Sequence, residues 1–99
     1  MRKIQNRESI LKAMQEFETL GREVFLRRYG FGTAHRYLLI HDGKEYDSKA
    51  ILGVAYGFEY PSEGPLSSED FVGGRGVQRR LEALGFEVRV MESDIAGDE

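Results

Sequence analysis

Apolar positions recur at helical spacing in the first third of the chain. One apolar stripe of helical period runs from Glu8 to Leu20 and comprises Ile10, Leu11, Met14, Phe17 and Leu20. Gly21 then supplies a C-terminal stop, and the following residues predict a second, shorter helix from Arg22 to Tyr29, closed by Gly30. We therefore expect two helices joined by a tight corner.

The pattern changes to that of strands in the middle of the chain. His35 to His41 is rich in aromatic and aliphatic residues, and Lys44 to Asp47 is a second strand-like run. Asp42-Gly43 between them is a strong hairpin signal, because its turn needs positive φ angles. A third helix is expected from Ser48 to about Gly57, with Asp47 or Ser48 as its cap.

The last third begins with a long loop. Glu59 to Gly74 contains both prolines, and one helical turn is expected within it, at Ser67 to Phe71. A final helix ends at Gly85, and Phe86 to Met91 alternates as a half-buried strand. The helix is marked by Val77, Leu81 and Leu84. These elements predict an α+β fold of order ααββααβ, in which about four helices pack on one face of a small three-stranded antiparallel sheet.

Composition and length limit the class of protein. The 99 residues contain no cysteine, which excludes disulfides and cysteine-based zinc sites. The apolar runs are far shorter than the roughly 20 residues that a membrane span needs, and the N-terminus lacks the apolar stretch of a signal peptide. We expect one cytoplasmic domain over residues 1–91, followed by an acidic, flexible tail at residues 92–99.

Charge is distributed unevenly along the chain. The net charge is −3, but residues 1–50 carry a net +3 and residues 51–99 a net −6. Much of the negative charge lies in the acidic tail, so the folded part can present a basic face or an ordinary mixed surface.

The side chains offer little for catalysis. His35 and His41 lie six residues apart on one predicted strand, too far apart to share a metal, and no nucleophile-elbow motif occurs. Neither a phosphate-binding P-loop nor a dinucleotide fingerprint is present. We expect a non-catalytic binding module that uses no metal or other cofactor.

Two clusters are candidates for nucleic-acid contact. The first is a glycine-rich turn, Gly73-Gly74-Arg75-Gly76, which would expose backbone N–H groups at a helix start. The alternative is that these glycines only relieve crowding and the arginines are a solvated face. The second cluster mixes cations with aromatic rings, which could equally be core residues. Together the two predict DNA contacts by Arg27, Arg28, Arg36, Lys44, Tyr46, Ser48, Lys49, Arg75, Arg79 and Arg80.

Several segments together resemble a known family. They are Tyr29-Gly30-Phe31-Gly32, Tyr37 with His41-Asp42-Gly43, Tyr46-Asp47-Ser48-Lys49-Ala50-Ile51 with Gly53-Val54-Ala55, Gly64-Pro65-Leu66, Asp70-Phe71 with Gly73-Gly74, and Leu81-Glu82 with Leu84-Gly85-Phe86. The chain resembles the N-terminal head domain of ScoMcrA-like modification-dependent (type IV) HNH restriction endonucleases, from about Glu8 to Val90. The resemblance implies a role in restricting modified or foreign DNA, with the nuclease and the reader of the modification lying outside this sequence. It carries no catalytic residues over to this chain.

Three hypotheses about the ligand follow. The first is DNA, modified or not. The second is a nuclease partner or a second copy of the chain, docked on an apolar patch of Tyr56, Phe58, Tyr60 and Phe71. The third is an acidic mimic of DNA built on the C-terminal half. The sequence leaves open the oligomeric state, and whether the chain is a stand-alone relative or an excised domain.

Overall fold

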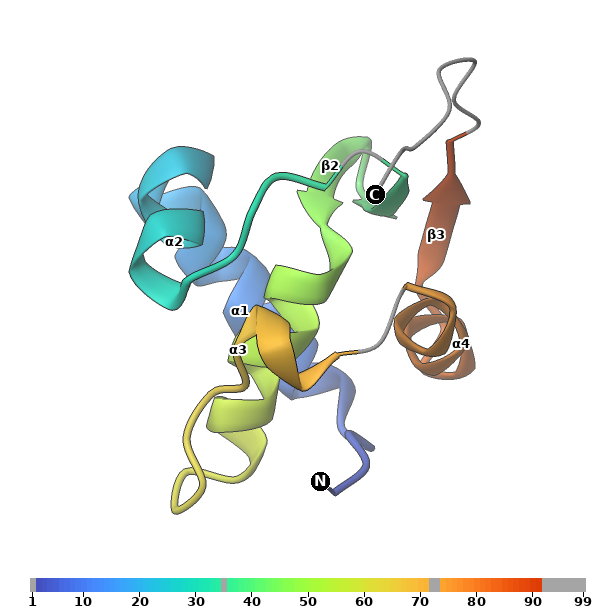
Figure 1. Ribbon diagram of the computed structural model, residues 1–99. Coiled ribbons are helices and arrows are strands. Elements are labelled where there is room, and N and C mark those ends of the chain that lie inside the picture. Colours follow the sequence, from blue (N-terminus) through green and yellow to red (C-terminus); the bar gives the residue numbers. More distant parts are fainter. Residues whose placement is uncertain (1, 35, 72–73, 92–99) are drawn as a thin grey trace.

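The chain forms the secondary structure in the order expected from the sequence. Figure 1 shows the computed structural model, which describes residues 2–34, 36–71 and 74–91. The elements are α1 (Arg7–Leu20), α2 (Arg22–Tyr29), β1 (Tyr37–His41), β2 (Lys44–Asp47), α3 (Ser48–Glu59), the 3-10 turn η1 (Ser68–Asp70), α4 (Arg75–Ala83) and β3 (Glu87–Val90). The α+β class with four helices and three antiparallel strands is confirmed.

The sheet has the order β2-β1-β3, with β1 antiparallel to both neighbours. Its hairpin turns at Asp42 and Gly43, which both adopt positive φ angles, 52° and 76°. This is the turn geometry that suits the right-handed twist of paired strands. Leu39 faces Tyr46 on one side and Val88 on the other, and all three are buried. This face of the sheet therefore belongs to the core.

Helix α3 is the centre of the molecule, with α1 packed along it and α2 beside α1 (Figure 1). Every residue of α3 from Ala50 to Tyr56 is buried. Two glycines let the loop after α3 approach the helix backbone. A Cβ at Gly53 would lie 2.9 Å from the Leu66 carbonyl oxygen, and one at Gly57 would lie 2.7 Å from the Pro65 nitrogen.

Some boundaries and one cap differ from the sequence prediction. β1 begins at Tyr37, and α3 extends to Glu59. Asp47 occupies the N-cap position of α3 but makes no capping hydrogen bond, because its carboxylate accepts from the Arg22 guanidinium and from the Ala34 N–H. Ser48 does not cap the helix either, since its hydroxyl donates to the Tyr37 carbonyl. His35, Gly73 and the predicted acidic tail lie outside the described residues.

Two tyrosine hydroxyls tie α2 and β2 to α1. Tyr29 donates to Glu16 and Tyr46 donates to Glu18. Burial, and then the hydrogen bond to Glu16, raise the pKa of Tyr29 to about 12. Burial, and then the hydrogen bond to Glu18, raise the pKa of Tyr46 as well. Both hydroxyls therefore stay protonated well into the alkaline range.

These shifts predict the alkaline limit of stability. The pKa of Tyr29 in the folded protein exceeds the ordinary value of about 10, so its contribution is complete below about pH 10 and is lost as the pH rises toward 12. Urea unfolding at pH 8 and at pH 11.5 should show that Tyr29→Phe is less stable than the wild type at pH 8. That deficit should shrink at pH 11.5. An equal loss of stability at both pH values would contradict the raised pKa of Tyr29 and its hydrogen bond to Glu16.

Candidate nucleic-acid interface

Helix α4 directs three arginines away from the core. Its apolar side is buried through Val77 and Leu81. Arg75 and Arg79 are separated by one turn and are exposed, and Arg80 is half-buried at the flank of the helix. Among the residues that the structure describes, none of these arginines forms an ion pair. Their charge is therefore available to an anionic ligand.

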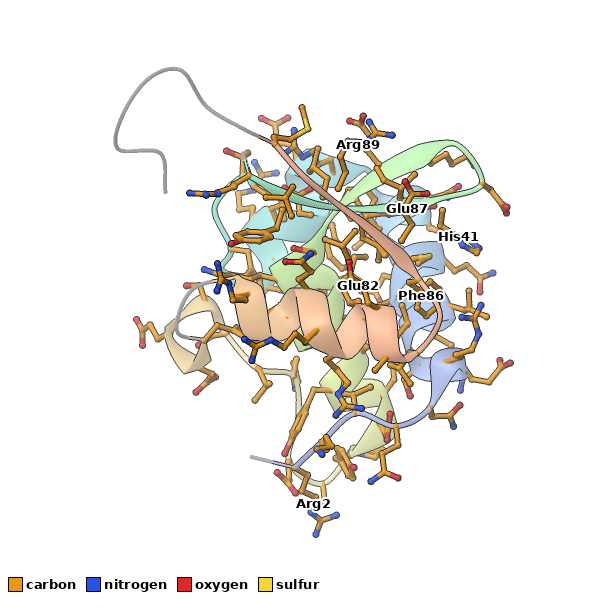
Figure 2. All side chains as sticks on the ribbon, turned by 90° about the vertical axis from the view of Figure 1, so that its right-hand side faces the viewer. Arg2, His41, Glu82, Phe86, Glu87 and Arg89 are labelled. Carbon is orange, nitrogen blue, oxygen red and sulfur yellow. The ribbon has the colours of Figure 1, made fainter. Side chains whose placement is uncertain are left out.

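The N-terminal segment brings two further cations beside α4. Arg2 and Lys3 line the same hollow as Gly76 and Arg80 of α4. The segment is held in place by buried Ile4 and by the Tyr60 hydroxyl, which donates to the Lys3 carbonyl at 2.6 Å. In Figure 2, Arg2 lies below α4, whereas Glu82 lies on the side of α4 toward β3. Arg2, Lys3 and Arg80 thus line one hollow, whereas Arg75 and Arg79 lie about 100° or more around α4 from Arg80. We call these five cations together the α4 basic face.

Arg2 and Lys3 are absent from the set predicted from sequence. No periodic pattern marks residues 2–6, and their place beside α4 depends on a contact between the two ends of the chain. The one local signal is Ile4, an apolar residue within a basic stretch, which is buried as an anchor. Arg2 is also partly neutralised, because its guanidinium lies 3.1 Å from the Glu63 carboxylate.

The glycine-rich turn before α4 has a packing role at Gly74. A Cβ on this residue would lie 2.3 Å from the Tyr37 ring, so only glycine allows the ring to rest on the backbone. The alternative interpretation, that the glycines relieve crowding, thus holds at Gly74. Beside it lies a small cleft of about 120 Å³, lined by the start of α3 and by half-buried Lys49.

The second predicted cluster is not one surface. Lys44 lies 2.9 Å from Glu18 and lines a different hollow, together with His41 and Asp42. Arg28 lies 3.9 Å from Glu16 on α1. Arg36 stands over the Tyr37 ring, with its guanidinium carbon 5.9 Å from the ring centre. Arg27 is exposed on α2.

Tyr46 and Ser48 must be removed from the predicted contact set. They are 3% and 1% exposed, and both hydroxyls donate to partners inside the domain. A side chain buried in this way cannot reach a phosphate or a base. Both residues instead fix the junction between β2 and α3.

The exposed apolar patch predicted from the sequence is also wrong. Tyr56 is 1% exposed and belongs to the core, whereas Phe58 on the same helix is 39% exposed. Tyr60 and Phe71 are half-buried and pack against the core. These four rings therefore do not form one exposed surface.

The described residues offer no metal centre. Within residues 2–34, 36–71 and 74–91, no three side chains of metal-ligating type gather together. The described ranges also contain no helix with the length and apolar character of a membrane span.

The fold and the distribution of charge thus define the class of this protein. It is a small α+β domain with a basic face on its last helix. The family model described as "ScoMcrA-like, N-terminal head domain" matches residues 2–90. The chain belongs to this family of head domains, as the resemblance indicated.

A solved structure agrees with this assignment. It is titled as the Type IV phosphorothioation-dependent restriction endonuclease ScoMcrA, and it is similar at a TM-score of 0.65 and 30% sequence identity. The match covers 89% of this chain but only 13% of that much longer protein. No curated protein matches the sequence.

Proposed function

We propose that this chain is a non-catalytic head that holds DNA for a modification-dependent restriction endonuclease. The observation that carries the proposal is the exposed pair Arg75 and Arg79 on α4, with Arg80 at its flank, none of which forms an ion pair with any described residue. Arginines of this kind bind backbone phosphates by charge and position a protein on DNA without reading its sequence. The cutting activity belongs to other domains of the enzyme.

Family membership supports DNA as the polyanion. The similar solved protein is named as a restriction endonuclease that depends on phosphorothioation. A phosphorothioate linkage keeps the single negative charge of an ordinary phosphate. A head that contacts the backbone through arginine charge should therefore hold modified and unmodified duplexes alike, and leave discrimination to the rest of the enzyme.

Salt-dependent binding tests the proposal. We expect the anisotropy of a short labelled duplex to report binding that weakens steeply between about 50 and 200 mM salt. The double variant Arg75→Glu, Arg79→Glu should bind at least about tenfold more weakly, and its logarithmic salt slope should be smaller by about 2, because two phosphate contacts are lost. Unmodified and phosphorothioate duplexes should respond alike.

Lys12→Glu is the matched control. Lys12 is an exposed cation on α1 that lies outside the α4 basic face and forms no ion pair with the described residues. Its substitution makes the same change of charge per residue and should have a much smaller effect. If Lys12→Glu lost half as much binding free energy as the double variant, which is its share of the change in charge, the effect would be one of net charge alone. Salt-independent binding or no binding would refute the proposal.

A further inference from the structure

An apolar pocket opens beside the α4 basic face. It has a volume of about 330 Å³ and lies between the N-terminal segment, α3, α4 and the segment around η1. This volume is at the lower end of the range for ligand pockets in proteins. Its walls are formed by Ile4, Leu52, Tyr56, Leu66, Phe71 and Val77.

The walls of the pocket are held in place from behind. Ile4, Leu52 and Val77 are buried members of the core. The Tyr56 hydroxyl donates to Glu63 at 2.6 Å and accepts from the Arg2 N–H at 2.9 Å. The Leu66 N–H donates to the Gly53 carbonyl at 3.0 Å. The pocket is therefore preformed, and an occupant has little ordering cost to overcome.

The rim of the pocket is positively charged. Lys3 and Arg80 stand on it without an ion pair to any described residue. Asp70 is the one acidic residue among the described residues of the rim, and its carboxylate accepts from the Ser67 N–H at 2.8 Å, so the two cations outnumber it. The rim thus favours negative charge around an occupant whose centre is apolar.

We propose that this pocket docks a protein segment that inserts a leucine- or phenylalanine-sized side chain and flanks it with carboxylates. A nucleobase fits the walls less well, because an unstacked base is recognised by hydrogen bonds to its edge, and these walls are aliphatic and aromatic. A buried apolar anchor within a ring of charged contacts is the usual form of a protein-binding hot spot. The inference uses the pocket walls and is independent of DNA binding by Arg75 and Arg79.

A blocked hexapeptide, acetyl-Asp-Asp-Leu-Phe-Asp-Asp-amide, is a suitable probe. Methyl NMR spectra of the whole chain should show shifts of Ile4, Leu52, Leu66 and Val77 as the peptide is added. A peptide with alanines in place of the two apolar residues should bind about tenfold more weakly, because the anchor is lost. A peptide with lysines in place of the aspartates should also bind about tenfold more weakly, because Lys3 and Arg80 repel it.

Gly76 offers a way to close the pocket without disturbing the fold. It lies on the pocket wall, and an added Cβ there would meet nothing within 4 Å. Gly76→Met should place its side chain in the pocket and weaken binding of the acidic peptide by about tenfold or more. Ala83→Met, at an exposed position of the same helix, should bind the peptide as the wild type does.

Several outcomes would overturn the proposal. They are the absence of methyl shifts, equal binding of the acidic and basic peptides, and unchanged binding by Gly76→Met. Shifts of the same methyls by a single-stranded oligonucleotide but not by the acidic peptide would identify a base pocket instead. The Arg75→Glu, Arg79→Glu variant separates the two proposals, because it should lose DNA and keep the acidic peptide.

Discussion

Replacement of Asp47 by alanine is expected to lower the free energy of unfolding by about 3 kcal/mol. The carboxylate is 2% exposed and accepts three hydrogen bonds. Two come from the Arg22 guanidinium, both at 2.8 Å, and one comes from the Ala34 N–H at 2.7 Å. Alanine removes the acceptor from all three donors at once. Urea unfolding at neutral pH measures the loss.

Glu45→Ala is the matched control for Asp47→Ala. Glu45 lies on the same strand but is exposed, and its carboxylate is 3.4 Å from Arg89 on β3. A surface ion pair of this kind contributes little, so the control should change stability by less than about 1 kcal/mol. Comparable losses of stability from the two substitutions would show that the buried hydrogen bonds of Asp47 contribute no more than a surface ion pair.

Gly53→Ala is expected to destabilise the domain by about 2 kcal/mol, although alanine favours helices. The added Cβ would lie 2.7 Å from the Phe31 ring and 2.9 Å from the Leu66 carbonyl oxygen. The carbonyl is backbone, and its loop is tied to α3 by the hydrogen bond from the Leu66 N–H. The backbone at Leu66 therefore cannot move away easily to relieve the clash. Thermal and urea unfolding measure the effect.

Gly76→Ala makes the same chemical change in open space. Nothing lies within 4 Å of a Cβ at Gly76, which is in the first turn of α4. Here the higher helix propensity of alanine should stabilise the protein by about 0.5–1 kcal/mol. The two substitutions should thus have opposite signs, and a stabilising Gly53→Ala would contradict the close approach of Phe31 and Leu66 to α3.

Local patterns predict the elements of this fold well, because each depends on neighbours in the chain. The apolar stripe of α1, the end of α2 at Gly30 and the Asp42-Gly43 turn are all of this kind. The prediction that Asp47 or Ser48 caps α3 was wrong because of tertiary contacts. Asp47 has the right type and position for a cap, but the Arg22 side chain and the Ala34 N–H, more than ten residues away, take its oxygens.

The candidate site was only partly predictable for the same reason. Arg75 and Arg79 lie one turn apart on one short helix, so their spacing alone brings them together. The contribution of Arg2 and Lys3 requires the N-terminal segment to pass beside a helix some seventy residues later in the chain. The clustering of Tyr46 and Ser48 with cations in the sequence was misleading, because packing at the end of β2 and the start of α3 buries both side chains.

The direct passage from β2 into α3 limits how this domain can change in length. β2 ends at Asp47 and α3 begins at Ser48, with no residue between them. One inserted residue in this junction would rotate α3 by about 100° relative to the hairpin, and one face of its buried surface would turn outward. Insertions and deletions can therefore accumulate in the loop after α3 but not here. The segment Tyr46 to Ile51, which carries part of the family resemblance, spans this junction.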